Sequence, residues 1–465
     1  MSIRCHEDSI VRAVQTENTA DALIDSWGRA AAAASRVDAS LYTNYDVKRG
    51  LRDISGKGVL AGLTKIGDVI ASDVDAEEFV AASGQLIYRG IDIAHLVEGF
   101  TAERRLGFEE TCYLLLFGTL PDKDELCRFE ERLGAYRVLP KGFVHDAILE
   151  MPSNDIMNAL ARSVLALYAI DSRPDDISIS NVLRQSLQLI AAFPALTVYS
   201  YQAYLHHFKN KSLVIHSPVL ELSTAENILH MLRSDSRYSQ LEASVLDLAL
   251  ILHAEHGGGN NSSFTMHVVS SSGTDTYSAV AAALGSLKGP RHGGANIKTV
   301  QMLEELKQQV YDWEDDCEIE QYLLRLLNKD AFDRSGLIYG VGHAVYSASD
   351  PRALILKKYA ETLAKEKGLE DEFRLYAKVE EMAPEIINRK RKMYKGVCAN
   401  VDFYSGFVYR MLDIPKELFT PLFAISRIVG WCAHRIEELT SGGKIIRPAY
   451  KGITPRRKYI ALDKR

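Results

Sequence analysis

The sequence predicts a mainly α-helical protein with two domains. Helical spacing dominates, because apolar residues recur every three or four positions from Leu241 to Leu252 and again from Ile297 to Val310. Strand signals are few, and the clearest of them, Gln-Leu-Ile-Tyr-Arg-Gly at residues 85–90, is short. Helices do not alternate with strands as they do in a Rossmann fold, so we expect helices packed on helices.

The composition is that of a globular chain long enough to bury a large core. Of the 465 residues, 47% are hydrophobic and 25% are charged, and the net charge is −6. The lack of a long basic run argues against nucleic-acid binding, and no apolar run approaches the ~20 residues of a membrane span. Six scattered cysteines without a CxxC pair indicate a reducing compartment. We therefore expect a cytoplasmic protein with neither nucleic acid nor membrane as a partner.

His292 lies in Gly-Pro-Arg-His-Gly-Gly-Ala-Asn, residues 289–296, a turn that opens directly into a predicted helix. At a helix N-terminus, free N–H groups and the positive end of the dipole disfavour a second positive charge. The imidazole is therefore expected to be neutral near pH 7 and to donate a hydrogen bond to a developing oxyanion or enolate. The alternative is a loop histidine between turn glycines.

His253 and His256 lie near the end of a helix that we expect Gly257 to terminate. A helix C-terminus stabilises a protonated imidazole, so His253 could present a positive charge or a hydrogen-bond donor to an anionic ligand. Capping histidines are the alternative. The spacing of the two histidines, with Glu255 between them, also suits a metal ion. No cluster of cysteine or acidic residues supports that interpretation, so we predict no metal site.

A second glycine-flanked histidine, His343, ends Gly-Val-Gly-His at residues 340–343 and precedes Asp-Pro-Arg. Asp350 is predicted as a helix N-cap and Pro351 as the first helical residue. Arg352 then lies in the first helical turn, where a guanidinium suits a carboxylate ligand. A solvated arginine beside a tight turn is the alternative.

Asp402 stands in Asn-Val-Asp-Phe, residues 400–403, among apolar and aromatic neighbours. Desolvation there would raise its pKa and make it a stronger base, and the alternative is the N-cap of the helix that follows. Arg427 shares a helical stripe with Phe423 and Trp431, where a buried guanidinium requires an anionic partner. A dianionic ligand is one candidate for that partner, and an internal salt bridge is the other.

Together these segments resemble the citrate synthases. The four motifs Gly-Pro-x-His-Gly-Gly-Ala-Asn, Gly-x-Gly-His, Asp-Pro-Arg and Asn-Val-Asp-Phe, in this order, are specific as a set. The resemblance extends from residues 88–93 to Ile-Arg-Pro at 446–448. It implies a large helical domain at residues 1–293 and 412–465 and a small mobile domain at 294–411, with a cleft between them. It also implies a homodimer with shared active sites.

The resemblance further implies condensation of acetyl-CoA with oxaloacetate and hydrolysis of citryl-CoA to citrate and CoA. Asp402 would remove a methyl proton from acetyl-CoA, His292 would stabilise the enol, and His343 would donate to the oxaloacetate carbonyl. Oxaloacetate would be bound by His253, Arg352, Arg427 and Arg447, and Arg447 would reach into the site of the partner subunit. The residues that would flank CoA are Leu337, Ile338, Gly340, Val341, Gly342, Ala344 and Asn400. Acetyl-CoA is a cosubstrate here, and no permanently bound cofactor is expected.

Three alternatives compete with this function. The nearest is a 2-methylcitrate synthase, which uses propionyl-CoA and shares all of these residues; an apolar pocket discriminates one methylene by only ~1–3 kcal/mol. The second is a catalytically idle relative that binds CoA or a partner helix, against which the joint presence of His292, His343 and Asp402 argues. The third is a metallohydrolase built on His253 and His256.

One departure from the family pattern concerns the CoA phosphates. Many bacterial members carry a basic residue after the Gly-x-Gly-His histidine, whereas Ala344 and Ser347 leave this neighbourhood uncharged. Lys392 or Lys395 would then contact the phosphates instead.

Overall fold

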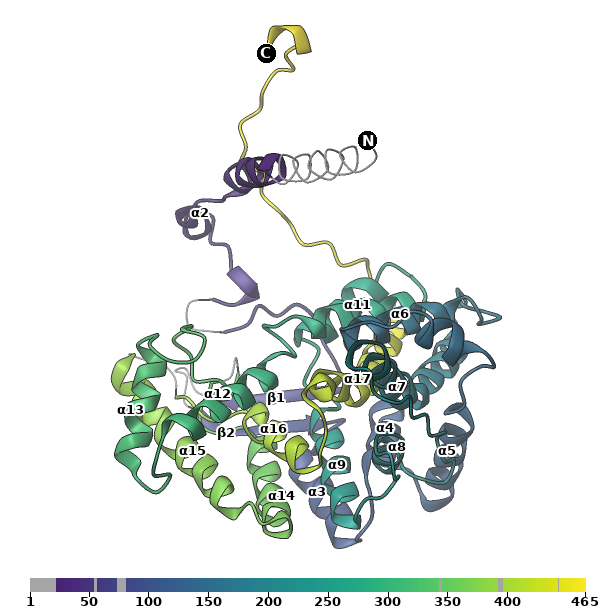
Figure 1. The fold of residues 1–465 in the computed structure, drawn as a ribbon. Helices are drawn as coiled ribbons and strands as arrows, with labels where there is room; N and C mark the ends of the chain where they lie inside the picture. The colour runs from purple at the N-terminus through teal and green to yellow at the C-terminus, as the bar shows by residue number, and fades with distance from the viewer. Residues whose placement is uncertain (1–21, 54–56, 73–80, 343–344, 392–395, 442) are drawn as a thin grey trace, which may run out of the picture. The chain divides into compact units, whose positions relative to one another are not determined.

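The chain forms two compact units, residues 1–61 and 62–465. The computed structural model describes residues 22–53, 57–72, 81–342, 345–391, 396–441 and 443–465 (Figure 1). The first unit contains a helix over residues 22–35, then α2 (Ala39–Asn44) and the 3-10 helix η1 (Arg49–Leu51). The second unit carries all of the predicted site residues. The expected division of that unit at residues 294 and 411 stays a prediction.

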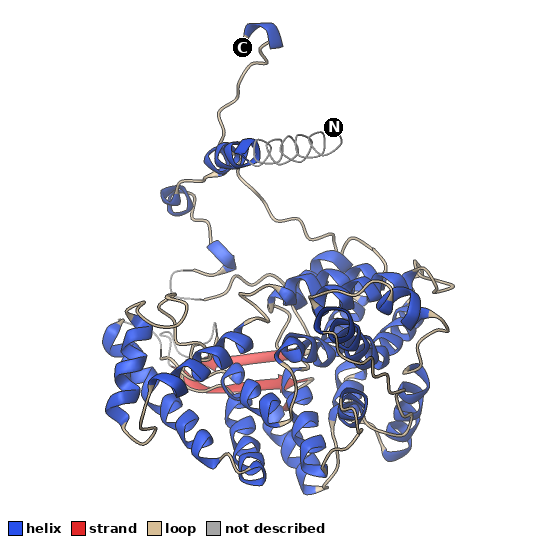
Figure 2. Cartoon of the chain, viewed as in Figure 1, coloured by secondary structure: helices blue, strands red, loops and turns tan. Residues whose placement is uncertain are grey.

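Helices make up most of the second unit, which confirms the mainly helical fold (Figure 2). They are α3 (Ile93–Ala102), α4 (Phe108–Phe117), α5 (Lys123–Tyr136), η2 (Val144–Leu149), α6 (Ile156–Tyr168), α7 (Ile179–Lys209), α8 (Thr224–Leu232), α9 (Gln240–His253), α10 (Asn261–Ser270), α11 (Thr276–Lys288), α12 (Ala295–Gln309), α13 (Asp316–Leu327), α14 (Pro351–Lys367), α15 (Glu370–Lys390), α16 (Val401–Met411), η3 (Lys416–Leu418), α17 (Phe419–Thr440) and η4 (Leu462–Lys464). Across the described ranges, no helix has both the length and the apolar character that a bilayer span requires.

A small antiparallel sheet accompanies the helices. Its strands, in the order β1 (Gly67–Ser72), β2 (Ala81–Tyr88) and β3 (Ile91–Asp92), include the strand predicted near residue 85. The side chain of Tyr88 is fully buried, and its hydroxyl lies 3.0 Å from the carbonyl oxygen of Ile251 and 3.1 Å from that of Glu255. These contacts join the end of β2 to the end of α9, where several predicted site residues lie.

Helix α17 is the central element of the second unit. It packs against α7, α9, α10, α11 and α4 (Figure 1). Three of the largest fully buried side chains of the protein, Arg427, Trp431 and Arg435, belong to it. Because two of these three are charged, α17 needs polar partners inside the core.

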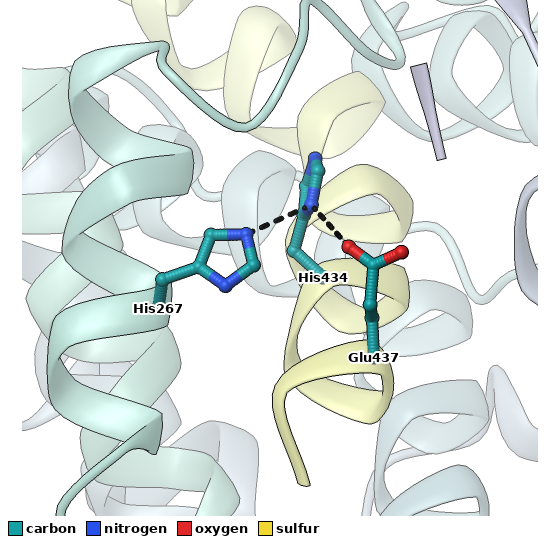
Figure 3. Close-up of side chains that lie close together, drawn as sticks. All are labelled: His267, His434 and Glu437. Carbon is teal, nitrogen blue, oxygen red and sulfur yellow. Dashed lines mark hydrogen bonds and ion pairs between the residues drawn. The ribbon is translucent and has the colours of Figure 1, made fainter. Parts of the chain in front are cut away.

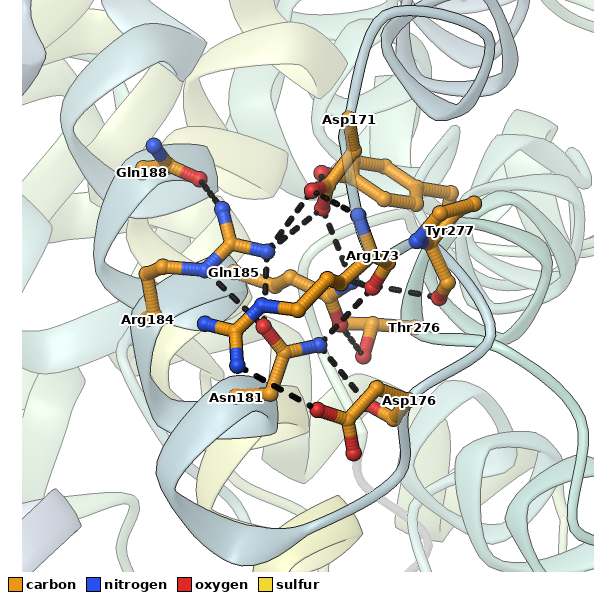
Figure 4. A network of polar contacts seen from close by, with 10 residues as sticks. Asp171, Arg173, Asp176, Asn181, Arg184, Gln185, Gln188, Thr276 and Tyr277 are labelled. Carbon is orange, nitrogen blue, oxygen red and sulfur yellow. Dashed lines mark hydrogen bonds and ion pairs between the residues drawn. The ribbon is translucent and has the colours of Figure 1, made fainter.

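Arg435 and the nearby Asp171 illustrate how such partners are supplied. Arg435 donates to Thr276 Oγ1 at 3.2 Å and to Ser270 Oγ at 3.1 Å. Asp171 accepts two hydrogen bonds of 2.8 Å from Arg184 Nη2 on α7 and one of 2.7 Å from the Tyr277 hydroxyl on α11 (Figure 4). These charges are satisfied within the protein and serve the packing of α7, α10, α11 and α17.

Candidate active site

Arg427 on α17 is fully buried but only partly satisfied. Its Nε donates to the carbonyl oxygen of His253 at 2.7 Å, and its Cζ lies 4.7 Å from the centre of the Phe423 ring. Among the described residues, Nη1 and Nη2 have no hydrogen-bond partner. Burial lowers the pKa of Arg427 to about 10, which still leaves it charged near pH 7. Within the described chain the internal salt bridge is therefore wrong, and two buried donors remain for an anionic ligand.

His253 is the last residue of α9 and is buried against Arg427. Its Nδ1 lies 2.7 Å from the carbonyl oxygen of Ala249, which can only accept, so Nδ1 carries a hydrogen. In the described structure its buried Nε2 has no partner. Burial above all, and then the charges of Arg352 and Arg427, lower the pKa of His253 to about 3. Of the two possibilities considered for His253, the positive charge does not hold for the unliganded protein, because desolvation outweighs the helix dipole.

The end of α9 also differs from the prediction. The helix stops at His253, four residues before Gly257, so His256 lies in the following turn. Among the described residues, the group of side chains with metal-ligand geometry is His267, His434 and Glu437. That group includes neither His253 nor His256, so the geometry lends no support to a metallohydrolase built on them.

His292 lies between α11 and α12, three residues before the first residue of α12. Its Nε2 is 3.1 Å from Ser262 Oγ. Burial, and then Arg427, lower the pKa of His292 to about 4, so the imidazole is neutral at pH 7. The predicted neutrality agrees with this value, but its main cause is desolvation rather than the helix N-terminus.

Asp402 lies in the first turn of α16. The N-cap of that helix is Asn400, whose side chain accepts from the backbone N–H of Asp402 at 2.9 Å. The capping role considered for Asp402 is therefore wrong. Burial raises the pKa of Asp402 to about 6, although Arg352 opposes this shift. A carboxylate with such a pKa is a stronger base than an exposed aspartate.

Arg352 follows Asp350 and Pro351 at the start of α14, and these two residues are the N-cap and first helical residue as predicted. Arg352 is buried, so the solvated-arginine alternative is wrong. Its Nε donates to Asp350 Oδ1 at 3.0 Å and its Nη2 to Asp350 Oδ2 at 2.7 Å. Asp350 thereby orients the arginine whose charge acts on both Asp402 and His253.

The segment predicted to flank CoA forms a short backbone pairing with the start of α16. The N–H of Gly342 donates to Cys398 O at 2.7 Å, and that of Asn400 donates to Gly340 O at 2.9 Å. Gly340 and Gly342 have φ values of +77° and +104°, which other residues rarely adopt. Val341 pairs with Ala399, Ile338 is buried, and Leu337 is 46% exposed. His343, Ala344, Lys392 and Lys395 lie outside the described residues.

Phe423 is a site residue that sequence analysis placed only on the stripe of Arg427. The centre of its ring lies 4.7 Å from that of His253 and 6.4 Å from that of His292. It therefore borders His253, His292 and Arg427 at once. Its position four residues before Arg427 was the signal available in the sequence.

Arg447 differs from the other predicted site residues in the described chain. It is exposed, in a segment without helix or strand that follows α17. The N–H of the preceding residue, Ile446, donates a hydrogen bond to Ser271 Oγ at 3.1 Å. The structure thus brings together His253, His292, Arg352, Asp402 and Arg427, and leaves Arg447 on the surface.

Comparison with known proteins supports the resemblance that the sequence motifs indicated. Residues 55–449 match the family model described as citrate synthase, C-terminal domain. The chain is 35% identical over 408 residues to a citrate synthase from Haloferax volcanii, covering 87% of this chain and 94% of that protein. It is 33% identical over 384 residues to a 2-methylcitrate synthase from Shewanella oneidensis, covering 81% and 91%.

A solved structure also matches the fold. It is the ternary complex of carboxymethyl coenzyme A and oxaloacetate with the citrate synthase of Thermoplasma acidophilum. The match has a TM-score of 0.72 at 27% sequence identity and covers 89% of this chain and 98% of that one.

Proposed function

The chain belongs to the citrate synthase family, acyltransferases that condense an acyl-CoA with oxaloacetate, and we propose that its acyl substrate is acetyl-CoA and its product citrate. The proposal covers the roles of individual residues as well as the choice of acyl group.

The observation that carries the proposal is the pair of buried Nη nitrogens on Arg427 that have no hydrogen-bond partner among the described residues. These groups are buried, so leaving them without a ligand costs free energy that a bound anion offsets. Oxaloacetate is a dianion, and a guanidinium binds a carboxylate through two parallel hydrogen bonds. Arg352, already oriented by Asp350, adds a second positive charge. Arg447 would complete the set from the partner subunit.

Asp402 is the proposed base for the first chemical step. Its carboxylate takes a proton from the methyl group of acetyl-CoA, the C–H electron pair forms the carbon–carbon double bond of an enolate, and the electron pair of the C=O bond moves to the thioester oxygen. His292 donates a hydrogen bond to the thioester oxygen, where negative charge develops. A neutral imidazole suits this role, since its conjugate acid has a pKa of about 4 and the ring keeps its proton as a donor. Ser262 can hold Nε2 so that the hydrogen resides on Nδ1.

In the second step the enolate carbon attacks the ketone carbon of oxaloacetate, and the electron pair of the ketone C=O bond moves to its oxygen. The ketone oxygen takes a proton from His343, a role that comes from the family motif, as His343 lies outside the described residues. The product, citryl-CoA, is then hydrolysed: water adds to the thioester carbonyl, the carbon–sulfur bond breaks, and CoA leaves as a thiol. The backbone at Gly340 and Gly342, with Asn400, would flank the CoA.

A 2-methylcitrate synthase remains the second candidate, because a relative of that activity is 33% identical to this chain. The test is to measure kcat/KM for acetyl-CoA and for propionyl-CoA with oxaloacetate, and to identify both products by mass spectrometry. We expect acetyl-CoA to be favoured at least about tenfold, which is the lower end of what one methylene can achieve. A preference for propionyl-CoA would assign the second function, and no turnover with either would indicate an idle relative.

A further inference from the structure

A row of imidazoles and carboxylates runs from the surface to the residues around Arg427. His267 on α10 has Nδ1 at 2.9 Å from Glu438 Oε2 and Nε2 at 3.1 Å from His434 Nδ1. His434, on α17, has Nε2 at 3.0 Å from Glu255 Oε1. Figure 3 shows His267 and His434 facing each other, with Glu437 beside them. The function proposed above uses none of these residues.

The hydrogen bonds assign the protons in this row. His267 Nδ1 faces a carboxylate and therefore carries a hydrogen. Burial, and then His434, lower the pKa of His267, so its ring is neutral and its Nε2 is an acceptor. His434 faces that acceptor with Nδ1 and a carboxylate with Nε2, so both of its nitrogens donate. His434 is accordingly an imidazolium. Although burial opposes this charge, Glu255 and Glu437 raise the pKa of His434 to about 9.

The same three residues, His267, His434 and Glu437, could instead hold a metal ion, since their ligand atoms lie close together. The ring nitrogens of the two histidines are 3.1 Å apart, a normal hydrogen-bond distance. A proton between them satisfies both nitrogens without an added ion. The geometry therefore favours the charged His434, and a metal becomes an outcome of the test.

The carboxylate of Glu255 is the inner end of the row, and the backbone around it is shaped to admit it. A Cβ atom on Gly430 would lie 2.4 Å from Glu255 Oε2, and one on Gly67 would lie 2.9 Å from Glu255 Cγ. Gly430 follows Arg427 by three residues on α17, and the same Cβ position is 3.5 Å from Arg427 Cδ. The Glu255 carboxylate and the aliphatic part of the Arg427 side chain thus both approach Gly430, where a larger residue would not fit.

We propose that Glu255, held in place by the charged His434, is a positioning residue for Arg427 and hence for oxaloacetate. Glu255 follows His253 by two residues, and the carbonyl of His253 takes the Nε hydrogen bond of Arg427. The fixed carboxylate offsets part of the cost of burying the guanidinium. The Glu255 carboxylate lies near the aliphatic part of the Arg427 side chain, so Nη1 and Nη2 of Arg427 remain available for the ligand. This inference rests on the proposed function, in which Arg427 binds oxaloacetate.

The test compares charge-removing variants with the wild-type enzyme. Glu255→Gln and His434→Gln keep polar side chains of similar size but remove the charge at each end of the pair. We expect each to weaken oxaloacetate binding about tenfold or more in calorimetric titration, because small misplacement of a binding group has large effects. We also expect KM for oxaloacetate to rise more than kcat falls. The double variant should lose less than the two single losses combined, because no buried charge is then left without its partner.

Two further variants guard against simple loss of folding. Gly67→Ala changes no charge but brings a Cβ atom to 2.9 Å from Glu255 Cγ and 3.2 Å from Glu255 Oε1, so it displaces the carboxylate, and it should also weaken oxaloacetate binding. Glu438→Gln is the matched control at the outer, partly buried end of the row, and its oxaloacetate affinity should stay within about twofold of wild type. Thermal unfolding, followed by circular dichroism, identifies any variant that is not folded.

Three results would overturn the proposal. If folded Glu255→Gln and Gly67→Ala bind oxaloacetate as wild type does while Arg427→Leu does not, the positioning role fails and the proposed function stands. If Arg427→Leu also binds normally, the proposed function itself fails. If the purified enzyme contains one equivalent of zinc that His267→Gln loses, the row is a metal site and His434 is not a cation.

Discussion

The guanidinium carbon of Arg427 lies 4.7 Å from the centre of the Phe423 ring, one helical turn earlier on α17. An aromatic face attracts a cation most where water is excluded, so the ring stabilises a charge that has no ion pair among the described residues. It does so without using a hydrogen-bond donor. The arrangement keeps a buried arginine charged while leaving Nη1 and Nη2 available for a ligand.

Arg427→Leu should therefore raise KM for oxaloacetate far more than KM for the acyl-CoA. Loss of a charge-assisted pair to a buried ligand costs about 2–5 kcal/mol. Arg435→Lys is the matched control, since Arg435 is also a buried arginine of α17 but donates to Thr276 and Ser270. It should lower the melting temperature and leave KM for oxaloacetate unchanged. Equal effects of Arg427→Leu on both substrates would point to a structural role.

Asp402→Asn should bind oxaloacetate nearly normally and lose most of its turnover. The amide is close in shape to the carboxylate but cannot accept the methyl proton, and loss of a general base typically costs 10²–10⁴-fold. Steady-state kinetics together with oxaloacetate titration separates the two effects. Near wild-type kcat in this variant would remove Asp402 from the mechanism.

The pH dependence of kcat/KM should reflect the protonation of Asp402. Asp402 has a pKa of about 6 and must be deprotonated to act as a base, so kcat/KM should fall as pH decreases below about 6. His292 and His253, with pKa values of about 4 and 3, stay neutral between pH 5 and 8 and should not contribute. The profile is measured with both substrates well below saturation. A flat profile down to pH 5 would contradict the raised pKa.

Removing the negative charge of Asp402 should also stabilise the folded protein. Because burial raises the pKa of Asp402 above its ordinary 3.8, the ionised carboxylate disfavours the folded state above about pH 6. Below about pH 4 the group is protonated in both states and has no such effect. Asp402→Asn should therefore raise the unfolding free energy at pH 8 by up to about 3 kcal/mol, and much less at pH 4. Denaturant unfolding at the two pH values measures this difference.

Local signals in the sequence predicted much of the site. The N-cap and first residue of α14, at Asp350 and Pro351, follow from short-range hydrogen bonding and the fixed φ of proline. The burial of Arg427 followed from its neighbours on one helical stripe. Such features depend on residues within one or two turns, which a single sequence displays directly.

Features that depend on tertiary burial were not predictable in the same way. A positive charge was one possibility for His253 because it lies near a helix end, yet burial by distant elements lowers its pKa to about 3. The contact of His267 with His434 joins residues 167 positions apart, and no local pattern pairs them. The predicted end of a helix can also differ from the observed one: α9 ends at His253, before the glycines that were expected to end it.

We expect each active site to be shared between two subunits. Arg447 is exposed in this chain, in an extended segment beyond α17, whereas the family resemblance assigns it to oxaloacetate binding. A segment that leaves its own helix can reach a neighbouring subunit without disturbing the core. Arg447→Leu and Asp402→Asn should each be nearly inactive, and mixing the two proteins should restore activity.

The expected size of the recovery follows from a symmetric dimer. In a mixed dimer, one site holds both defects and the other holds neither. Random exchange makes about half of the dimers mixed, each with one intact site, so activity should approach about a quarter of wild type. Subunit exchange is verified by native mass spectrometry of differently tagged chains. If exchange occurs and activity stays at background, Arg447 acts within its own subunit or takes no part in the site.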